Sequence, residues 1–205
     1  QYFYFSTFNT SKYEAMTKFK KRFFWIFGTL LVIILLFRFV IGPVIKTQTK
    51  KYSPEQHITY HQGGLELNVF YCSPIKKGRV IFGELIPYGE VWRTGANEAS
   101  TFTTNKDLMI DGKELAKGIY SLWTIPGENS WQIIFNSEMY EWGVKYTDQT
   151  ASRDPETDAL TVRVPVSKSL TVTESFTISF SETEAGTLMI LAWDTTVVPV
   201  LLQEK

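Results

Sequence analysis

One apolar run near the amino end constrains this chain more than any other feature. The run reads FFWIFGTLLVIILLFRFVIGPVI from Phe23 to Ile45, and its one charge, Arg38, lies toward the far end. As an α-helix it would be about 34 Å long, enough to cross a hydrocarbon core of roughly 30 Å. The long stem of Arg38 can extend to the headgroups. The sequence therefore predicts a transmembrane helix over residues 23–45 rather than the buried core helix of a soluble protein.

A cleaved signal peptide is the second alternative for the same run. Such a peptide has an apolar region of only about 7–15 residues and then a small-residue cleavage site. Here the run is longer, and Gly42 is followed by Pro43, which makes a poor place to cut. We therefore interpret the run as an uncleaved signal anchor, with the lipid bilayer as its partner.

Charge is distributed unevenly on the two sides of the run. The chain is neutral, with 21 basic and 21 acidic residues, but residues 1–45 hold six basic residues and one acidic residue. Four of the basic residues directly precede the run: Lys18, Lys20, Lys21 and Arg22. The positive-inside rule then predicts a short cytoplasmic amino end over residues 1–22 and places the rest on the extracytoplasmic, periplasmic side of the inner membrane.

The first fifteen residues are interpreted separately. Met16 is followed by TKFKKRFFW, which is typical of a bacterial start, so residues 1–15 are either upstream sequence or a genuine cytoplasmic tail. On the other side of the run, residues 46–56 are polar and contain Pro54, which predicts a short linker.

From residue 57 to residue 205 the apolar residues recur with a period of two. Leu65, Leu67 and Val69 alternate with Glu66 and Asn68, and similar alternation covers residues 131–135, 160–166 and 172–180. Such alternation is typical of half-buried strands. Nearly continuous apolar runs over 188–193 and 197–202 predict two central strands, with a turn at Asp194 between them.

Turn signals separate the strands, and Asp111-Gly112 predicts a two-residue hairpin of the primed type. Nine to eleven strands at this spacing predict an all-β domain, an antiparallel β-sandwich or jelly-roll-like fold, with a closed barrel as the alternative. The five tryptophans of this part would fill a core between two sheets. They are Trp92, Trp123, Trp131, Trp142 and Trp193.

The densest polar and aromatic stretch runs from Pro87 to Ala99. Arginine offers a planar fork for a carboxylate or phosphate, and tryptophan offers a flat face for a sugar or cation. One interpretation is a ligand-binding cleft with six candidate residues: Trp92, Arg93, Asn97, Glu98, Tyr120 and Trp123. In the alternative, Arg93 pairs with Glu98 or Glu90 and only pins a loop.

This stretch also carries a family resemblance. VWRTGANEAST resembles the hallmark of a family of Bacteroidetes-type bacteria, domain of unknown function 2911. YCSPIKKGRVIFG, GKELAKGIYSLWTIPG, WQIIFN and WDTTVVPV agree with it in the right order, over roughly residues 57–200. The resemblance implies an all-β, usually exported domain and transfers no catalytic residue. Many members have a secretion signal, so the retained anchor is a departure.

Other reactive side chains give weaker patterns. His57 and His61 would share one face of a strand and suit zinc or copper, but a third ligand is needed and Glu66 is only a guess. Cys72 has no resolving partner and is predicted to be a buried, inert thiol. Short catalytic motifs are absent from the sequence. A carboxylate pair could still act on glycosides, with four candidates near aromatic residues: Glu84, Glu90, Glu98 and Asp194.

Together these patterns predict a membrane-anchored β-sandwich of the bacterial cell envelope that binds a ligand or a protein partner without catalysis. An envelope hydrolase, acting on a carbohydrate or ester through Arg93 and Glu98, is the second hypothesis. The third is an accessory subunit of a membrane protein complex, in which Gly28 and Thr29 let a partner helix approach. The neutral charge argues against nucleic acid as a partner, and we predict no cofactor.

Overall fold

The structure is a computed structural model that describes residues 10–145 and 147–205. The chain divides into two compact units, one ending at Gln48 and one running from Thr49 to Lys205. Each unit is described by itself below. The interpretation of residues 1–15 as upstream sequence or a cytoplasmic tail falls, for residues 1–9, outside the described residues.

The first unit is helical, as the apolar run predicts. Helix α1 (Thr10–Leu36) continues through a π-helical turn, η1 (Phe37–Ile41), into α2 (Gly42–Tyr52). The π turn has a local cause, because Pro43 has no N–H to donate to the carbonyl four residues back. The N–H of Gly42 instead bonds the carbonyl of Phe37.

The apolar helix meets the length and composition needed to cross a membrane. In the described part of the chain it is the one helix that does so, and none of its most apolar stretch is buried in the protein. A Cβ built on Gly28 would find no atom within 4 Å, so this face of the helix is open. An exposed apolar helix near the amino end suggests a membrane anchor or a signal sequence.

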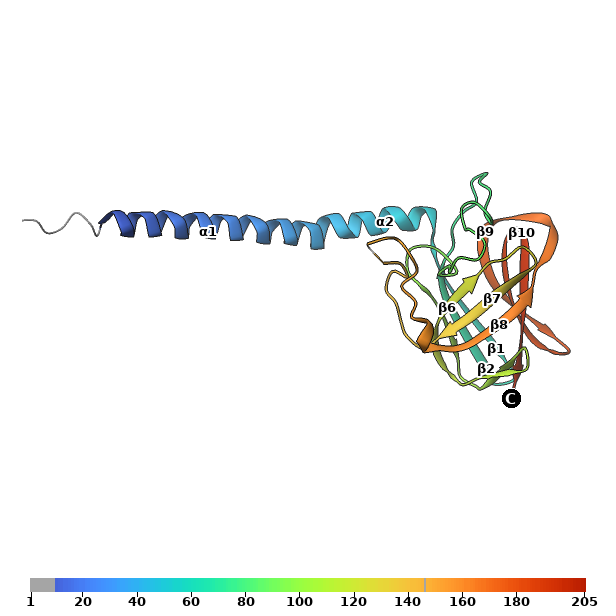
Figure 1. Cartoon of the computed structure of the whole chain (residues 1–205). Helices are drawn as coiled ribbons and strands as arrows, with labels where there is room; N and C mark the ends of the chain where they lie inside the picture. Colours follow the sequence, from blue (N-terminus) through green and yellow to red (C-terminus); the bar gives the residue numbers. More distant parts are fainter. Residues whose placement is uncertain (1–9, 146) are drawn as a thin grey trace, which may run out of the picture. The chain divides into compact units, whose positions relative to one another are not determined.

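The second unit is a sandwich of two antiparallel sheets (Figure 1). In spatial order, the six-stranded sheet contains β1 (Glu55–Gln62), β2 (Leu65–Cys72), β3 (Ser100–Thr104), β6 (Gly118–Ile125), β7 (Ser130–Asn136) and β8 (Asp158–Pro165). The four-stranded sheet contains β5 (Lys113–Leu115), β4 (Leu108–Ile110), β10 (Gly186–Glu204) and β9 (Ser167–Thr183). The predicted β-sandwich with a preceding apolar helix is therefore confirmed.

The core lies between the two sheets and follows the predicted alternation. Leu65, Leu67 and Val69 of β2 are buried, and their neighbours in the sequence are only half-buried. Trp92, Trp123, Trp131 and Trp193 are buried, as the sequence predicts for core tryptophans, whereas Trp142 is half-buried. Phe82 and Phe176 join three of these tryptophans in a cluster of mostly edge-to-face rings.

The predicted hairpin at Asp111-Gly112 is confirmed, since both residues have positive φ and join β4 to β5. The predicted turn at Asp194 is wrong. Residues 186–204 form one long strand, in which Asp194 (φ 56°) lies at an irregularity of the register. Its carboxylate accepts a hydrogen bond from Lys76 Nζ at 2.6 Å, and this ion pair holds the side chain.

Two long connections carry most of the irregular structure. The 73–99 connection joins β2 to β3, and the 137–157 connection joins β7 to β8 and ends in the short helix η2 (Pro155–Thr157). Tyr146 of the second connection is not described. Both connections supply walls of the cavity that forms the candidate site.

Candidate functional site

A cavity of about 660 Å³ lies in the second unit, between the two connections. Two buried tryptophans, Trp92 and Trp193, form part of its walls and are 7% and 2% exposed. The 73–99 connection supplies Pro74, Ile75, Lys77, Arg79, Leu85, Ile86, Val91, Trp92, Arg93, Gly95 and Ala96. Tyr52, Ser53, Gly143, Val144, Gln149, Ala151 and Trp193 complete the lining. A volume of this size suits a small organic ligand.

The backbone of the VWRTGANEAST segment is bent to present Trp92 and Arg93 to the cavity. Trp92 exchanges two backbone hydrogen bonds with Thr124, of 2.8 and 2.9 Å. Directly after this bridge, Thr94 is buried with a φ of 56°, a conformation that a β-branched residue rarely adopts. A Cβ on Gly95 would come within 2.9 Å of the Cys72 carbonyl oxygen, so only glycine fits there.

Hydrogen bonds from side chains hold this bent segment. The indole N–H of Trp92 donates to the carbonyl of Gly95 at 2.8 Å, and the Ser100 hydroxyl donates to the carbonyl of Thr94 at 2.8 Å. Backbone strain of the kind seen at Thr94 costs on the order of 1–3 kcal/mol and persists where the surroundings enforce it. Strained backbone of this kind clusters at ligand-binding and active sites, and here it lies directly beside two side chains that line the cavity.

Arg93 joins the two connections across the cavity. Its Nη1 donates to the main-chain oxygen of Trp142 at 2.8 Å, and its stem packs so closely on Gly143 that a Cβ there would lie 3.0 Å from Arg93 Cδ. Burial lowers the pKa of Arg93, and the neighbouring Cys72 and Glu98 oppose that shift. The guanidinium therefore carries its charge in a partly desolvated setting.

Two further cations line the cavity. Lys77 Nζ sits 3.6 Å from the centre of the Tyr52 ring, in a cation–π contact. Arg79 donates to the carbonyls of Lys76 and Ile75, at 2.9 and 2.5 Å. Among the described residues that line the cavity there is no aspartate or glutamate. The lining is therefore basic in a chain that is neutral as a whole.

Glu98 belongs to a polar cluster with a lysine and the cysteine. One carboxylate oxygen accepts from Lys50 at 3.1 Å and the other from the Cys72 thiol at 3.2 Å. Desolvation alone would raise the pKa of Glu98, but the hydrogen bonds from Cys72, its own backbone and Lys50 outweigh it, so this pKa is lowered. Lys50 also pairs with Glu55.

The remaining predicted site residues lie in other surroundings. Asn97 is buried with a φ of 58°, and its Nδ2 donates to the Ser53 carbonyl at 3.4 Å. Tyr120 packs on Phe135 and donates to the carbonyl of Ala116. Trp123 is fully buried, and its indole N–H bonds the Ser121 hydroxyl. Of the six predicted residues, the structure brings Trp92 and Arg93 together at the cavity.

The predicted reactive side chains are dispersed. His57 lies over the ring of Phe70, and His61 Nδ1 is 4.0 Å from a Glu66 oxygen. Over residues 10–145 and 147–205, His, Cys, Asp and Glu form no group of three or more able to hold a metal ion. Cys72 is fully buried, and its pKa is raised by desolvation and by Glu98. A raised pKa leaves the thiol protonated near neutral pH.

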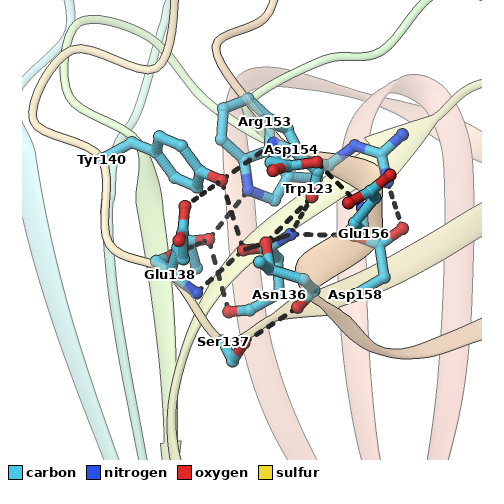
Figure 2. A network of polar contacts seen from close by, with 11 residues as sticks. Trp123, Asn136, Ser137, Glu138, Tyr140, Arg153, Asp154, Glu156 and Asp158 are labelled. Atoms are coloured by element: carbon cyan, nitrogen blue, oxygen red, sulfur yellow. Dashed lines mark hydrogen bonds and ion pairs between the residues drawn. The ribbon is translucent and has the colours of Figure 1, made fainter.

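The 137–157 connection is held by a network around Asn136, which is fully buried (Figure 2). Asn136 Nδ2 donates to the Asp154 carbonyl, the Thr157 hydroxyl and an Asp158 carboxylate oxygen, at 2.8 to 2.9 Å. Its Oδ1 accepts from the Glu138 N–H at 2.9 Å and from the Thr157 hydroxyl at 3.1 Å. Arg153 pairs with Asp158 beside it. The network thus fixes both ends of the connection that carries Gly143, Val144 and Ala151.

Sequence reasoning missed part of this site. Lys77 and Arg79 lie in the segment YCSPIKKGRVIFG, where the close spacing of cations beside Pro74 and Gly78 was the available signal. Asn136 ends a strand pattern and gives no signal of its own, because its partners lie 18 to 22 residues farther along the chain.

The comparisons with known proteins bear on the β domain. The model of the family "Protein of unknown function (DUF2911)" matches residues 53–202, and the chain belongs to this family. The resemblance found in the sequence is therefore confirmed. Neither the search of curated proteins nor that of solved structures gives a match.

Proposed function

We propose that this member of the DUF2911 family is a membrane-anchored protein of the cell envelope that binds a small molecule in the cavity between its two connections. In this proposal the helix spans the inner membrane, and the β domain lies on its periplasmic side. The four basic residues before the apolar run support this orientation: Lys18, Lys20, Lys21 and Arg22.

One observation carries the binding function. A cavity of about 660 Å³ combines a buried aromatic wall with a half-buried, charged arginine. The rings of Trp92 and Trp193 are nearly parallel, 20° apart, with centroids separated by 6.0 Å. Apolar walls with a few polar groups are the general composition of small-molecule sites.

The structure supports binding over catalysis by Glu98. A general acid that works near neutral pH needs a raised pKa, whereas hydrogen bonds lower the pKa of Glu98. Its oxygens are engaged by Lys50 and Cys72. A hydrolase built on Arg93 and Glu98 would need the carboxylate in the cavity, and the lining there comes from other residues.

The binding proposal is tested on the full chain, extracted from its native membrane in detergent. Small molecules that co-purify are released and identified by mass spectrometry. Ala96→Trp places a large ring in the cavity, because Ala96 lines it, and Ala185→Trp adds the same ring at an exposed turn. We expect a compound to be retained by the wild type and Ala185→Trp and lost from Ala96→Trp. Equal retention by all three proteins would contradict a ligand in this cavity.

The anchoring proposal has its own test. Full-length protein should sediment with membranes and resist extraction by high salt and alkali, because a transmembrane helix is not held by charge. In spheroplasts, added protease should digest the β domain. A β domain that is digested only after the inner membrane has been lysed would place it on the cytoplasmic side.

A further inference from the structure

The basic lining of the cavity restricts the chemistry of what it holds. Lys77, Arg79 and Arg93 belong to it, and the described lining residues include no carboxylate. Two carboxylates lie behind the lining: Glu98 acts on Arg93, and Glu174 accepts from the backbone N–H of Lys77. Elsewhere in the same unit basic residues have acidic partners, for example Lys76 with Asp194 and Arg153 with Asp158. A group of cations without a lining carboxylate attracts an anion.

The three cations differ in how firmly they are held. Arg93 is held in place by the Trp142 carbonyl and by close packing on Gly143. Lys77 and Arg79 are exposed and belong to the same connection. An arginine with a fixed guanidinium can bind an oxyanion with a defined geometry, while exposed cations chiefly raise the local concentration of anions.

The apolar walls require a second feature of the ligand. Trp92 and Trp193 line the cavity with Ile86, Val91 and Leu85. A free inorganic ion would leave these surfaces in contact with water, whereas an apolar body would cover them. The cavity volume is far larger than one oxyanion needs.

We propose that the cavity binds an amphiphilic oxyanion, in which a phosphate or carboxylate meets Arg93, Arg79 and Lys77 and an apolar body covers Trp92 and Trp193. This inference rests on the proposed function and names the ligand class for the same cavity.

The chain leaves two sources open for such a ligand. Tyr52, a lining residue, follows the end of the apolar run at Ile45 by seven residues. Seven residues span at most about 25 Å, so a membrane anchored by that run would lie within this distance of Tyr52. Anionic lipid headgroups and soluble amphiphilic anions share the chemistry that the cavity selects.

The test uses the full chain in lipid nanodiscs, with calorimetric titration of water-soluble probes. Phenyl phosphate carries both features, benzyl alcohol lacks the charge, and inorganic phosphate lacks the apolar body. In discs of zwitterionic lipid we expect phenyl phosphate to bind at least tenfold more tightly than either of the other two. If the natural ligand is an anionic lipid, discs that contain phosphatidylglycerol should weaken phenyl phosphate binding by competition. Unchanged binding would point to a soluble ligand.

Paired charge variants decide the role of the cations. Lys77→Gln with Arg79→Gln removes two exposed cations of the cavity, and Lys117→Gln with Arg163→Gln removes two exposed cations elsewhere. We expect the first pair to weaken phenyl phosphate binding about tenfold or more and the second pair to leave it unchanged. Arg93→Gln should weaken phenyl phosphate binding more than the Lys77 and Arg79 pair does, and a melting curve verifies that this variant is folded.

Three results would each overturn the inference. The first is equal affinity for phenyl phosphate and benzyl alcohol, and the second is an equal effect of the two pairs of charge variants on phenyl phosphate binding. The third is that phenyl phosphate binds in neither kind of disc. Binding of benzyl alcohol that Ala96→Trp abolishes would reject the anion but leave the cavity as a binding site, so the two proposals can fail separately.

Discussion

The two connections that wall the cavity differ in the main interaction that holds them. In the 73–99 connection, Ile81 and Trp92 are buried in the core, and Phe82 packs against Trp131. Of its described residues, the 137–157 connection packs only Tyr140 and Ala151 on a small buried cluster, and a polar network around Asn136 holds its two ends (Figure 2). One wall is therefore held mainly by burial of apolar side chains in the core, and the other mainly by hydrogen bonds.

This difference predicts different responses to mutation. Apolar burial contributes roughly in proportion to the area removed from water, so each side chain adds its own share. A buried polar network is cooperative, and a missing member leaves several partners unsatisfied at once. We expect the first wall to weaken gradually and the second to detach as a unit.

The largest expected effect is that of Trp92→Ala. The substitution removes a buried ring that contacts Trp131, Phe176 and Trp193, and we expect it to lower the free energy of unfolding by about 3–5 kcal/mol. Thermal unfolding of the full chain in nanodiscs, followed by near-ultraviolet circular dichroism, measures it. Trp142→Ala, at a half-buried tryptophan of the other wall, should cost less. Equal losses would remove the distinction between the walls.

Asn136→Ala should have the second-largest effect. We expect it to lower the free energy of unfolding by about 2–3 kcal/mol, because the Asp158 carboxylate and the Thr157 hydroxyl lose a buried partner. Its diagnostic result is local. Hydrogen exchange should accelerate throughout residues 137–157 while residues 73–99 keep their protection. Asn129→Ala, at an exposed position, is the matched control. Acceleration spread evenly over both connections would show that the second wall is not a separate cooperative unit.

Arg93→Ala probes the link between the walls. We expect it to lower the free energy of unfolding by about 1.5–3 kcal/mol because one hydrogen bond from a charged donor is lost. The sequence left open a buried Arg93–Glu98 pair, whose disruption would cost about 3–5 kcal/mol. Denaturant titration therefore separates the two interpretations. Arg93→Lys keeps the charge without the planar fork and should recover only part of the loss.

The same contrast explains how much the sequence could predict. Apolar periodicity predicted the strands, the tryptophan core and the apolar helix, because burial depends on residues two apart or on one continuous run. It also predicted a break at Asp194, since a polar residue between two apolar runs resembles a turn. The strand continues there: Asp194 pairs with Thr173 of β9, and Lys76, distant in the sequence, binds its carboxylate.

Only one wall of the candidate site could be predicted from the sequence. Trp92 and Arg93 stood out as a dense polar and aromatic segment with two glycines. The second wall did not, because Gly143, Val144 and Ala151 are ordinary loop residues whose placement depends on Asn136. The other four predicted residues are near Trp92 and Arg93 only along the chain or on β6: Asn97, Glu98, Tyr120 and Trp123. Their side chains are directed by partners that local patterns do not reveal.

The smallest expected effect concerns the ionic support of the first wall. Because the pKa of Glu98 is lowered in the folded state, its contribution to stability is present above its ordinary pKa of 4.5 and disappears as pH falls through the folded-state value. Glu98→Gln should therefore be less stable than the wild type at pH 6, and this difference should shrink below pH 4.5. Glu84→Gln, at an exposed carboxylate, serves as the control.

The contradicting result is a stability difference between Glu98→Gln and the wild type that stays constant from pH 6 to pH 3 or widens in acid. It would show that the Lys50 and Cys72 contacts do not favour the charged carboxylate. The first wall would then be held by apolar burial and its own backbone, without ionic support from Glu98.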